Sequence, residues 1–187
     1  MGEPLLCFDA VWKAILNLND AEGLALGARR FTISTAGVVP GIERMARESV
    51  DVGLAISLHA PNDELRDQLV PINRRYPLQR LLAAVRLYIE RNGRRVTFEY
   101  ALAKDVNDSD EHARQTVALL QGLLCHVDLI PLNLTPGCDL EPTPRARVMR
   151  FQELLVKGRI RTTVRLRRGQ DIAAGCGQLR SQHPPNG

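Results

Sequence analysis

The stretch Val52–His59, with the sequence VGLAISLH, decides the fold class of this chain. Its large side chains fall on one face of an extended strand: Val52, Leu54, Ile56 and Leu58. Its small or polar residues fall on the other face: Gly53, Ala55, Ser57 and His59. Such a strand is typical of a (β/α) barrel, because the bulky face meets the surrounding helices and the small face meets a crowded interior.

Strand-like runs alternate with helical patterns along the rest of the chain. The other expected strands are Arg29–Thr35, Arg95–Leu102, His126–Leu132 and Ile160–Arg167. Apolar residues recur at helical spacing over 78–92, 109–124 and 143–155, and shorter helices fit 9–19, 40–48 and 62–70. This alternation predicts an α/β fold with a parallel sheet, either part of a (β/α) barrel or an open doubly wound sheet. Residues 1–180 are expected to form one domain and residues 181–187 a frayed tail.

The composition is that of an ordinary soluble globular protein of 187 residues, 44% hydrophobic and 25% charged. No apolar run approaches the ~18 residues that a membrane span needs, and no signal-peptide pattern is visible, so no membrane partner is expected. The four cysteines lie far apart with no CxxC pair, which indicates a reduced, cytoplasmic protein without a local metal motif. The net charge of +4, with only three lysines among 25 basic residues, permits an anionic partner such as RNA.

Polar residues gather where the expected strands end: Ser34, Ser57, His59, Glu99 and Asn133. In (β/α) barrels the carboxyl ends of the strands surround the open mouth and supply the functional groups. The pattern therefore predicts a binding site there, with ordinary turn polarity as the alternative. A carboxylate in an apolar strand is costly unless it is paired, so Glu99 is either a site residue or the partner of a buried arginine.

Other features of the sequence point to chemistry less directly. Gly2 allows close approach of a ligand, and the neighbouring Glu3 suits an ammonium or a hydroxyl group. Cys176 lies among small residues in AAGCGQL that would leave its thiol accessible, although a small buried cysteine is the commoner case. The basic residues from Lys157 to Arg168 suit a phosphate backbone, but charge on an edge strand explains them as well.

Several strings together go further than any single residue. In order they are MGEPLL, TISTAGVVPGI, LAISLHAPNDELRDQLVPIN, VTFEYALAKDVND, CHVDLIPLN and RRGQDIAAGCGQLR. The chain resembles, in these strings, the radical-SAM methyltransferases that modify adenine C2 in 23S ribosomal RNA and tRNA. The match covers about residues 1–180, and its block Ser57–Asn73 is highly specific.

The resemblance implies a partial (β/α) TIM-like barrel of the radical-SAM type, with S-adenosylmethionine (SAM) and a [4Fe-4S] cluster as cofactors. The residues that it implies for SAM are Gly2 and Glu3 at the methionine end, and Ser34, Ser57, Leu58, His59 and Asn133 along the rest. Cys176 would be the catalytic cysteine that carries the methyl group. The implied substrates are 23S ribosomal RNA and tRNA, and the full-length enzyme is expected to be a cytoplasmic monomer.

The chain departs from that family in one decisive respect. The CxxxCxxC motif that binds the cluster is absent from these 187 residues, and so is the second catalytic cysteine that precedes it. We therefore expect the C-terminal portion of such an enzyme, truncated before the third barrel strand, with no metal ligands and no activity alone. A non-catalytic remnant that binds SAM or RNA is the alternative.

Overall fold

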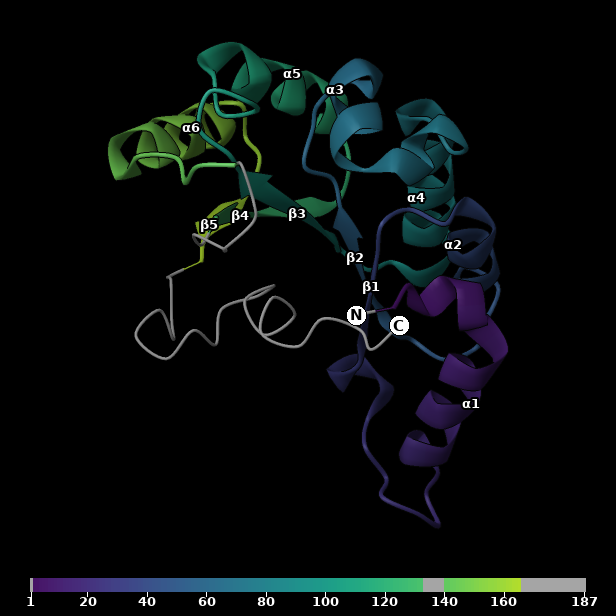
Figure 1. The fold of residues 1–187 in the computed structure, drawn as a ribbon. Helices are drawn as coiled ribbons and strands as arrows, with labels where there is room; N and C mark the ends of the chain where they lie inside the picture. Colours follow the sequence, from purple (N-terminus) through teal and green to yellow (C-terminus); the bar gives the residue numbers. More distant parts are fainter. Residues whose placement is uncertain (1, 133–139, 166–187) are drawn as a thin grey trace, which may run out of the picture. The chain divides into compact units, whose positions relative to one another are not determined.

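The computed structural model describes residues 2–132 and 140–165 (Figure 1). The helices are α1 (Phe8–Asn19), α2 (Val39–Met45), α3 (Asp63–Leu69), α4 (Leu78–Asn92), α5 (Asp110–Leu120) and α6 (Arg145–Lys157). The strands are β1 (Thr32–Thr35), β2 (Gly53–Ser57), β3 (Val96–Leu102), β4 (Cys125–Pro131) and β5 (Thr162–Val164). Short 3₁₀ turns cover Pro4–Cys7, Ala28–Arg30 and Pro71–Arg74. The predicted tail at 181–187 lies outside the described residues.

The strands form one parallel sheet in the order β1-β2-β3-β4-β5. This order follows the sequence without a reversal, as in a (β/α) barrel and unlike a doubly wound sheet. The α/β class and the part-barrel prediction are thereby confirmed. Contacts divide the chain into two compact units, which we describe separately: the first unit is Met1–Glu99 with Gly122–His126, and the second unit is Tyr100–Gln121 with Val127–Gly187. A single domain over residues 1–180 stays a prediction.

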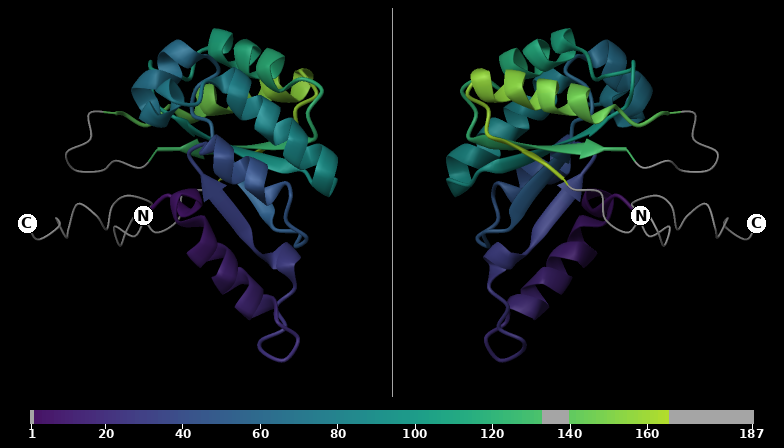
Figure 2. Two further views of the ribbon diagram at one scale, coloured as in Figure 1. Left: turned by 90° about the vertical axis from the view of Figure 1, so that its right-hand side faces the viewer. Right: turned by 90° about the vertical axis from the view of Figure 1, so that its left-hand side faces the viewer.

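In the first unit, helices α2 and α4 pack against each other beside strands β1 and β2 (Figure 2). The bulky face of β2 is buried as predicted, since Leu54 and Ile56 are 1% and 0% exposed. The hydroxyl of Tyr88 on α4 donates a hydrogen bond of 2.5 Å to the carbonyl of Val52 and so ties this helix to the start of β2. Helix α4 ends where the sequence predicts, because Gly93 takes the left-handed conformation at φ 61°.

In the second unit, α5 and α6 form a closely packed pair. Ser109, at the start of the predicted helical range 109–124, caps α5, with its hydroxyl accepting a 3.1 Å hydrogen bond from the backbone N–H of His112. Gly158, at the end of α6, allows the helices to approach, since a Cβ there would lie only 2.4 Å from Cγ1 of Val117. The apolar stripe predicted for α6 is confirmed, because Val148, Phe151 and Leu155 are buried.

The strands at both edges of the described sheet are shorter than the sequence predicts. Arg29 and Arg30, expected to begin a strand, lie in the 3₁₀ turn Ala28–Arg30, which the backbone N–H of Phe31 closes on the Ala28 carbonyl at 3.0 Å. At the other edge, Ile160 belongs to the end of α6, since its N–H donates to the Leu155 carbonyl at 2.9 Å. Local backbone hydrogen bonds therefore replace the ends of the sheet ladder.

Helix α5 also ends earlier than predicted. The expected stripe continued to Leu124, but the helix stops at Leu120 and the chain turns through Gly122 at φ 79°. Leu124 is 49% exposed as a result. Among the described residues, no helix is long and apolar enough to cross a membrane.

Candidate functional site

The strand-end residues of the first unit lie on one face of the sheet. In the parallel register Ser57 pairs with Glu99, so their side chains point to the same side, away from the buried face of β2. The hydroxyl of Ser34 on β1 donates a 3.3 Å hydrogen bond to Oε2 of Glu99 on β3. The structure thus brings Ser34, Ser57 and Glu99 together as the sequence pattern predicts.

Glu3 ties the N-terminal segment to the end of β1. Its Oε1 accepts a 3.2 Å hydrogen bond from the Leu5 N–H, and its Oε2 accepts a 2.8 Å bond from the Ala36 N–H. These contacts hold the exposed Gly2 beside the loop that follows Ser34, with open space where a Gly2 side chain would lie. Each carboxylate oxygen has two lone pairs, so Glu3 is still able to accept a hydrogen bond from a ligand.

The turn Ser57–Leu58–His59 follows β2 and extends its ladder. The N–H groups of Leu58 and His59 both approach the Glu99 carbonyl, at 2.9 Å and 3.4 Å. The Leu58 side chain is 0% exposed, so this residue offers a ligand only its backbone. His59 takes the left-handed conformation at φ 57°, which is uncommon for a residue with a side chain. The turn is therefore held by specific contacts.

The imidazole of His59 is neutral near pH 7. Burial, reinforced by the positive charge of Arg66, lowers the pKa of His59 to about 4. A neutral imidazole donates or accepts hydrogen bonds without repelling a cationic ligand. This property suits a site for a positively charged sulfonium or ammonium group.

The sign of the His59 shift predicts a pH dependence of stability. Because the pKa is lowered from 6.5 in the folded state, the unfolded chain binds the proton more readily, and stability falls as the pH drops from about 6.5 towards about 4. His59→Asn, which tolerates the left-handed backbone, is expected to flatten this fall in urea denaturation curves. The matched change His126→Gln is expected to leave the fall in place. An unaltered pH profile for His59→Asn contradicts this account.

Arg66 is the functional residue that sequence reasoning missed. It is 0% exposed and lies on α3. Its Nε donates to the Leu58 carbonyl at 3.1 Å, and its Nη2 donates to the carbonyls of Ser57 and Ala36 at 2.9 Å and 2.7 Å. Burial lowers the pKa of Arg66 to about 10, so the guanidinium keeps its charge at neutral pH. One buried cation thus fixes the backbone at the ends of β1 and β2.

Asn73 completes the support of this guanidinium. Its Oδ1 accepts from Nη1 of Arg66 at 2.8 Å, and its Nδ2 donates to carboxylate oxygens of Asp63 and Asp67 at 2.9 Å and 2.7 Å. Asp63 also accepts from the Leu78 N–H at 2.8 Å, which connects the network to α4. The one feature of the sequence that indicates the burial of Arg66 is its position four residues before the apolar Val70, which places both on the same face of a short helix.

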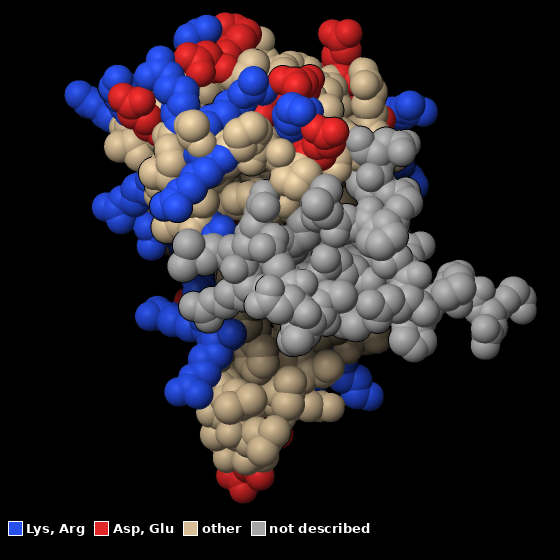
Figure 3. Space-filling view, turned by 60° about the vertical axis from the view of Figure 1, so that its left-hand side comes forward, with Lys and Arg blue, Asp and Glu red and all other residues tan. Residues whose placement is uncertain are grey.

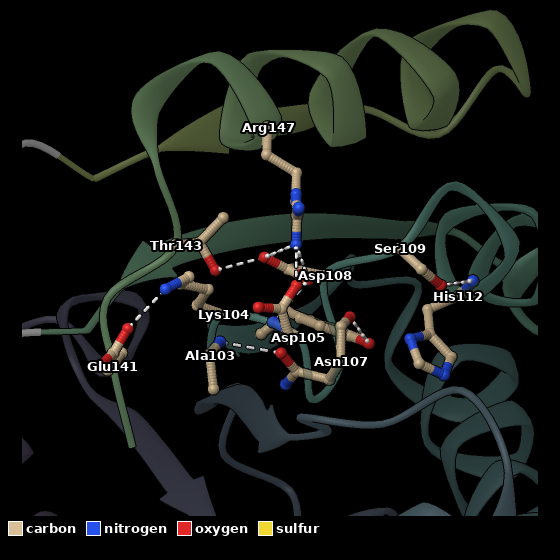
Figure 4. A network of polar contacts seen from close by, with 11 residues as sticks. Ala103, Lys104, Asp105, Asn107, Asp108, Ser109, His112, Glu141, Thr143 and Arg147 are labelled. Carbon is tan, nitrogen blue, oxygen red and sulfur yellow. Dashed lines mark hydrogen bonds and ion pairs between the residues drawn. The ribbon is translucent and has the colours of Figure 1, made fainter. Parts of the chain in front are cut away.

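The second unit holds a different polar network, drawn in Figure 4. Arg147 of α6 reaches Asp105 at 2.6 Å and the buried Asp108 at 3.0 Å. Asp108 also accepts from the Thr143 hydroxyl at 2.9 Å, and Lys104 pairs with Glu141 at 2.6 Å. These contacts join the loop after β3 to the segment that leads into α6. The network is a structural clamp, since every charge in it faces an opposite charge or a hydrogen-bond donor.

The described residues do not fit an iron–sulfur cluster. Within residues 2–132 and 140–165, no group of three or more His, Cys, Asp or Glu side chains is placed to hold a metal ion. Of the cysteines in these ranges, Cys7 is exposed, whereas Cys125 is buried and its pKa is raised to about 11 by that burial. Asn133, Cys138 and Cys176 lie outside the described residues. The predictions for Asn133 and Cys176 therefore stay predictions.

Comparison with known proteins decides the family. The model of the radical SAM superfamily matches residues 1–117 of the chain. This chain belongs to the radical SAM superfamily. The family-level resemblance inferred from the sequence strings is thereby confirmed.

Curated relatives carry the name "Probable dual-specificity RNA methyltransferase RlmN". The relative from Desulforamulus reducens is 50% identical over 97% of this chain and 52% of its own length. The relative from Caldanaerobacter subterraneus subsp. tengcongensis is 50% identical over 100% of this chain and 54% of its own. The chain thus spans about half the length of the curated relatives that it matches.

Solved structures agree with this placement. A radical SAM methyltransferase from Sphaerobacter thermophilus is 53% identical, with a TM-score of 0.93 over 95% of this chain and 52% of that one. SuiB from Streptococcus suis bound to S-adenosylmethionine matches with a TM-score of 0.65 at 12% identity over 98% of this chain and 43% of that one. The second likeness shows the shared fold alone.

Radical SAM enzymes use SAM and a [4Fe-4S] cluster, and the first unit fits only the former. Carboxylates at Glu3 and Glu99 suit an ammonium or ribose hydroxyls, the Ser34 and Ser57 hydroxyls both donate and accept, and the His59 imidazole is neutral. For the cluster, by contrast, the described residues contain no group of three or more His, Cys, Asp or Glu side chains that could act as its ligands.

Proposed function

We propose that this chain is the C-terminal part of an enzyme that transfers a methyl group from SAM to adenine C2 in 23S ribosomal RNA and tRNA. The support is its identity of 48–50% to relatives named as dual-specificity RNA methyltransferases, over nearly all of the chain. The enzyme acts in the cytoplasm as a monomer. A non-catalytic remnant that binds SAM or RNA is the second candidate, favoured by the absence of CxxxCxxC from the 187 residues.

The strand ends of the first unit hold SAM in this proposal. Gly2 and Glu3 take its methionine end, and the rest of it contacts Ser34, the turn Ser57–His59 and Asn133. The observation that carries the assignment is the Ser34–Glu99 hydrogen bond of 3.3 Å beside Ser57, on the side of the sheet opposite the buried face of β2. When bound, SAM supplies the methyl group, and the chain's own residues orient the cofactor at the carboxyl ends of the strands.

Cys176 receives and carries the methyl group in this proposal. A thiolate is the nucleophile required for such a step, and a sequence of small residues such as AAGCGQL is expected to leave a thiol accessible. The cluster ligands must come from cysteines other than those of this chain, because its four cysteines contain no CxxxCxxC. The 187-residue chain alone is therefore expected to bind SAM and to methylate no RNA.

Calorimetric titration of the chain with SAM tests the binding site. We expect Ser34→Ala and Glu99→Gln each to weaken SAM binding roughly tenfold to a hundredfold, the cost of a lost hydrogen bond to a charged group. The matched changes are Ser49→Ala on an exposed turn and Glu111→Gln on α5, and both are expected to leave the affinity within about twofold. Thermal melting of each variant checks that its fold is intact. Equal affinity in all four variants contradicts the proposed site.

A further inference from the structure

Most of the basic side chains that the structure describes in the second unit lie within 4.0 Å of a carboxylate. Arg114 lies 3.2 Å from Glu111, and Arg150 lies 3.1 Å from Asp110. Arg159 and Arg161 differ from these, because both are exposed and no carboxylate lies within 4.0 Å of either among the described residues, which is also true of Arg145 at the start of α6. Their charge is therefore not neutralised by the part of the fold that the structure describes.

The backbone of Arg159 is in an unfavourable conformation for an arginine. It follows the last turn of α6 at φ 63°, in the left-handed region that glycine normally occupies at a helix end. The N–H of Arg159 donates to the Val156 carbonyl, and that of Ile160 to the Leu155 carbonyl, each at 2.9 Å. The neighbouring Gly158 is needed where it is, because any side chain there would collide with Val117. The helix end alone would favour a glycine at 159 as well.

Arg161 continues the same exposed edge. It directly precedes β5, which pairs with β4 and is the last strand of the described sheet. At the upper left of the surface in Figure 3, Lys and Arg side chains gather with Asp and Glu side chains among them. Positive charge without a carboxylate partner among residues 2–132 and 140–165, at Arg159 combined with conformational strain, points to a ligand of opposite charge.

We propose that Arg159 and Arg161 bind phosphates of the RNA substrate. This inference rests on the proposed function, which supplies RNA as the polyanion. The planar guanidinium suits bidentate contact with a phosphate, and neutralising phosphates is the main source of RNA affinity. Protection of an edge strand is the competing explanation of the same charges, but a residue of either sign would serve that purpose.

The test separates these roles with Arg159→Gly and Arg161→Glu in the 187-residue chain. The probe is an unmodified tRNA transcript, with binding followed by fluorescence anisotropy between about 50 and 200 mM salt. Arg159→Gly removes the strain, so we expect it to raise Tm by about 2–4 °C. The same change is expected to weaken RNA binding roughly threefold. It is also expected to make the fall of log affinity with log salt shallower, reducing the magnitude of the slope by about 1.

Arg161→Glu keeps a charge at the edge of the sheet but reverses its sign. We expect it to weaken RNA binding roughly tenfold at the lower salt concentration without promoting aggregation. Arg114→Gln, an exposed arginine paired within α5, is the matched control and is expected to bind the transcript like the wild type. Unchanged RNA binding in both test variants, or no binding of the transcript by the wild type, overturns the inference. SAM titration of the same samples reports separately on the proposed function, because neither arginine belongs to the SAM site.

Discussion

Replacing Arg66 with methionine is expected to lower the free energy of unfolding by about 3–5 kcal/mol, the range for removing one partner of a buried charged network. Methionine fills a similar volume but has no hydrogen to donate. The carbonyls of Ala36, Ser57 and Leu58 would then each lose the hydrogen bond from the arginine, and of these the Leu58 carbonyl keeps another, from the Ala60 N–H at 2.8 Å. These carbonyls belong to the backbone and cannot be replaced together with the arginine, so the change leaves unsatisfied buried acceptors. Urea denaturation measures the loss as a lower midpoint with an unchanged slope.

Two further variants define what the Arg66 result means. Arg66→Lys keeps the charge, but a single ammonium group does not span the same carbonyls, so most of the loss is expected to remain. Arg86→Met, at an exposed position on α4, is expected to change stability by less than about 0.5 kcal/mol. If Arg66→Met is as stable as the wild type, the guanidinium does not hold the strand ends.

The largest functional effect is expected at Cys176. In an enzyme of the full length of its relatives, Cys176→Ala should lower the methylation of RNA roughly a thousandfold or more while SAM binding is unchanged. The reason is that alanine has no sulfur to carry the methyl group. Mass spectrometry of digested RNA measures the modified adenine, and Cys7→Ala is the matched control because Cys7 is exposed and outside the proposed machinery.

The same assay distinguishes the enzyme from the non-catalytic remnant. The 187-residue chain alone is expected to produce no methylated adenine, because it lacks the CxxxCxxC ligands. Methylation by the full-length protein that survives Cys176→Ala contradicts the role of this cysteine. A full-length protein that binds SAM but never methylates RNA supports the remnant.

Much of the fold could be predicted because its signals are local. The alternation of large and small residues in Val52–His59 identified a strand with one buried face, and the structure confirms it at Leu54 and Ile56. The helix predicted over 78–92 is confirmed as α4, because Pro77 and the left-handed Gly93 set its two ends.

The errors arose where a local signal competes with another local structure. The apolar stripe of α5 continues to Leu124 in the sequence, but Gly122 turns the chain first, and periodicity alone does not report that turn. The edge strand is predicted to begin at Ile160, but the N–H of Ile160 donates to the Leu155 carbonyl at the end of α6, and β5 begins only at Thr162. Boundaries of this kind depend on the backbone rather than on the pattern of side chains.

The candidate site could be predicted in part for a different reason. Ser34 and Ser57 lie at the carboxyl ends of neighbouring parallel strands, where barrels place functional groups. Glu99 was predicted at a strand end but lies in the middle of β3, and it meets the other two because it pairs with Ser57 in the register. The sequence does not predict the role of Arg66, because an arginine on a short helix is normally exposed. Only its contacts with the Ser57 and Leu58 carbonyls show that it supports the turn at Ser57–His59. The structure also confirms that Leu58 lies on the buried, bulky face of the segment Val52–His59, so that only its backbone is available to a ligand.

Hydrogen–deuterium exchange of the chain with and without SAM measures whether the strand ends of the first unit bind the cofactor. We expect slower exchange with SAM in the segment after β1 that contains Ala36 and in the turn Ser57–His59, with little change in α5 and α6. These amides lie at the strand ends where Glu3, Ser34 and Glu99 gather. Unchanged exchange at both strand ends under saturating SAM, or protection confined to the second unit, would contradict this expectation.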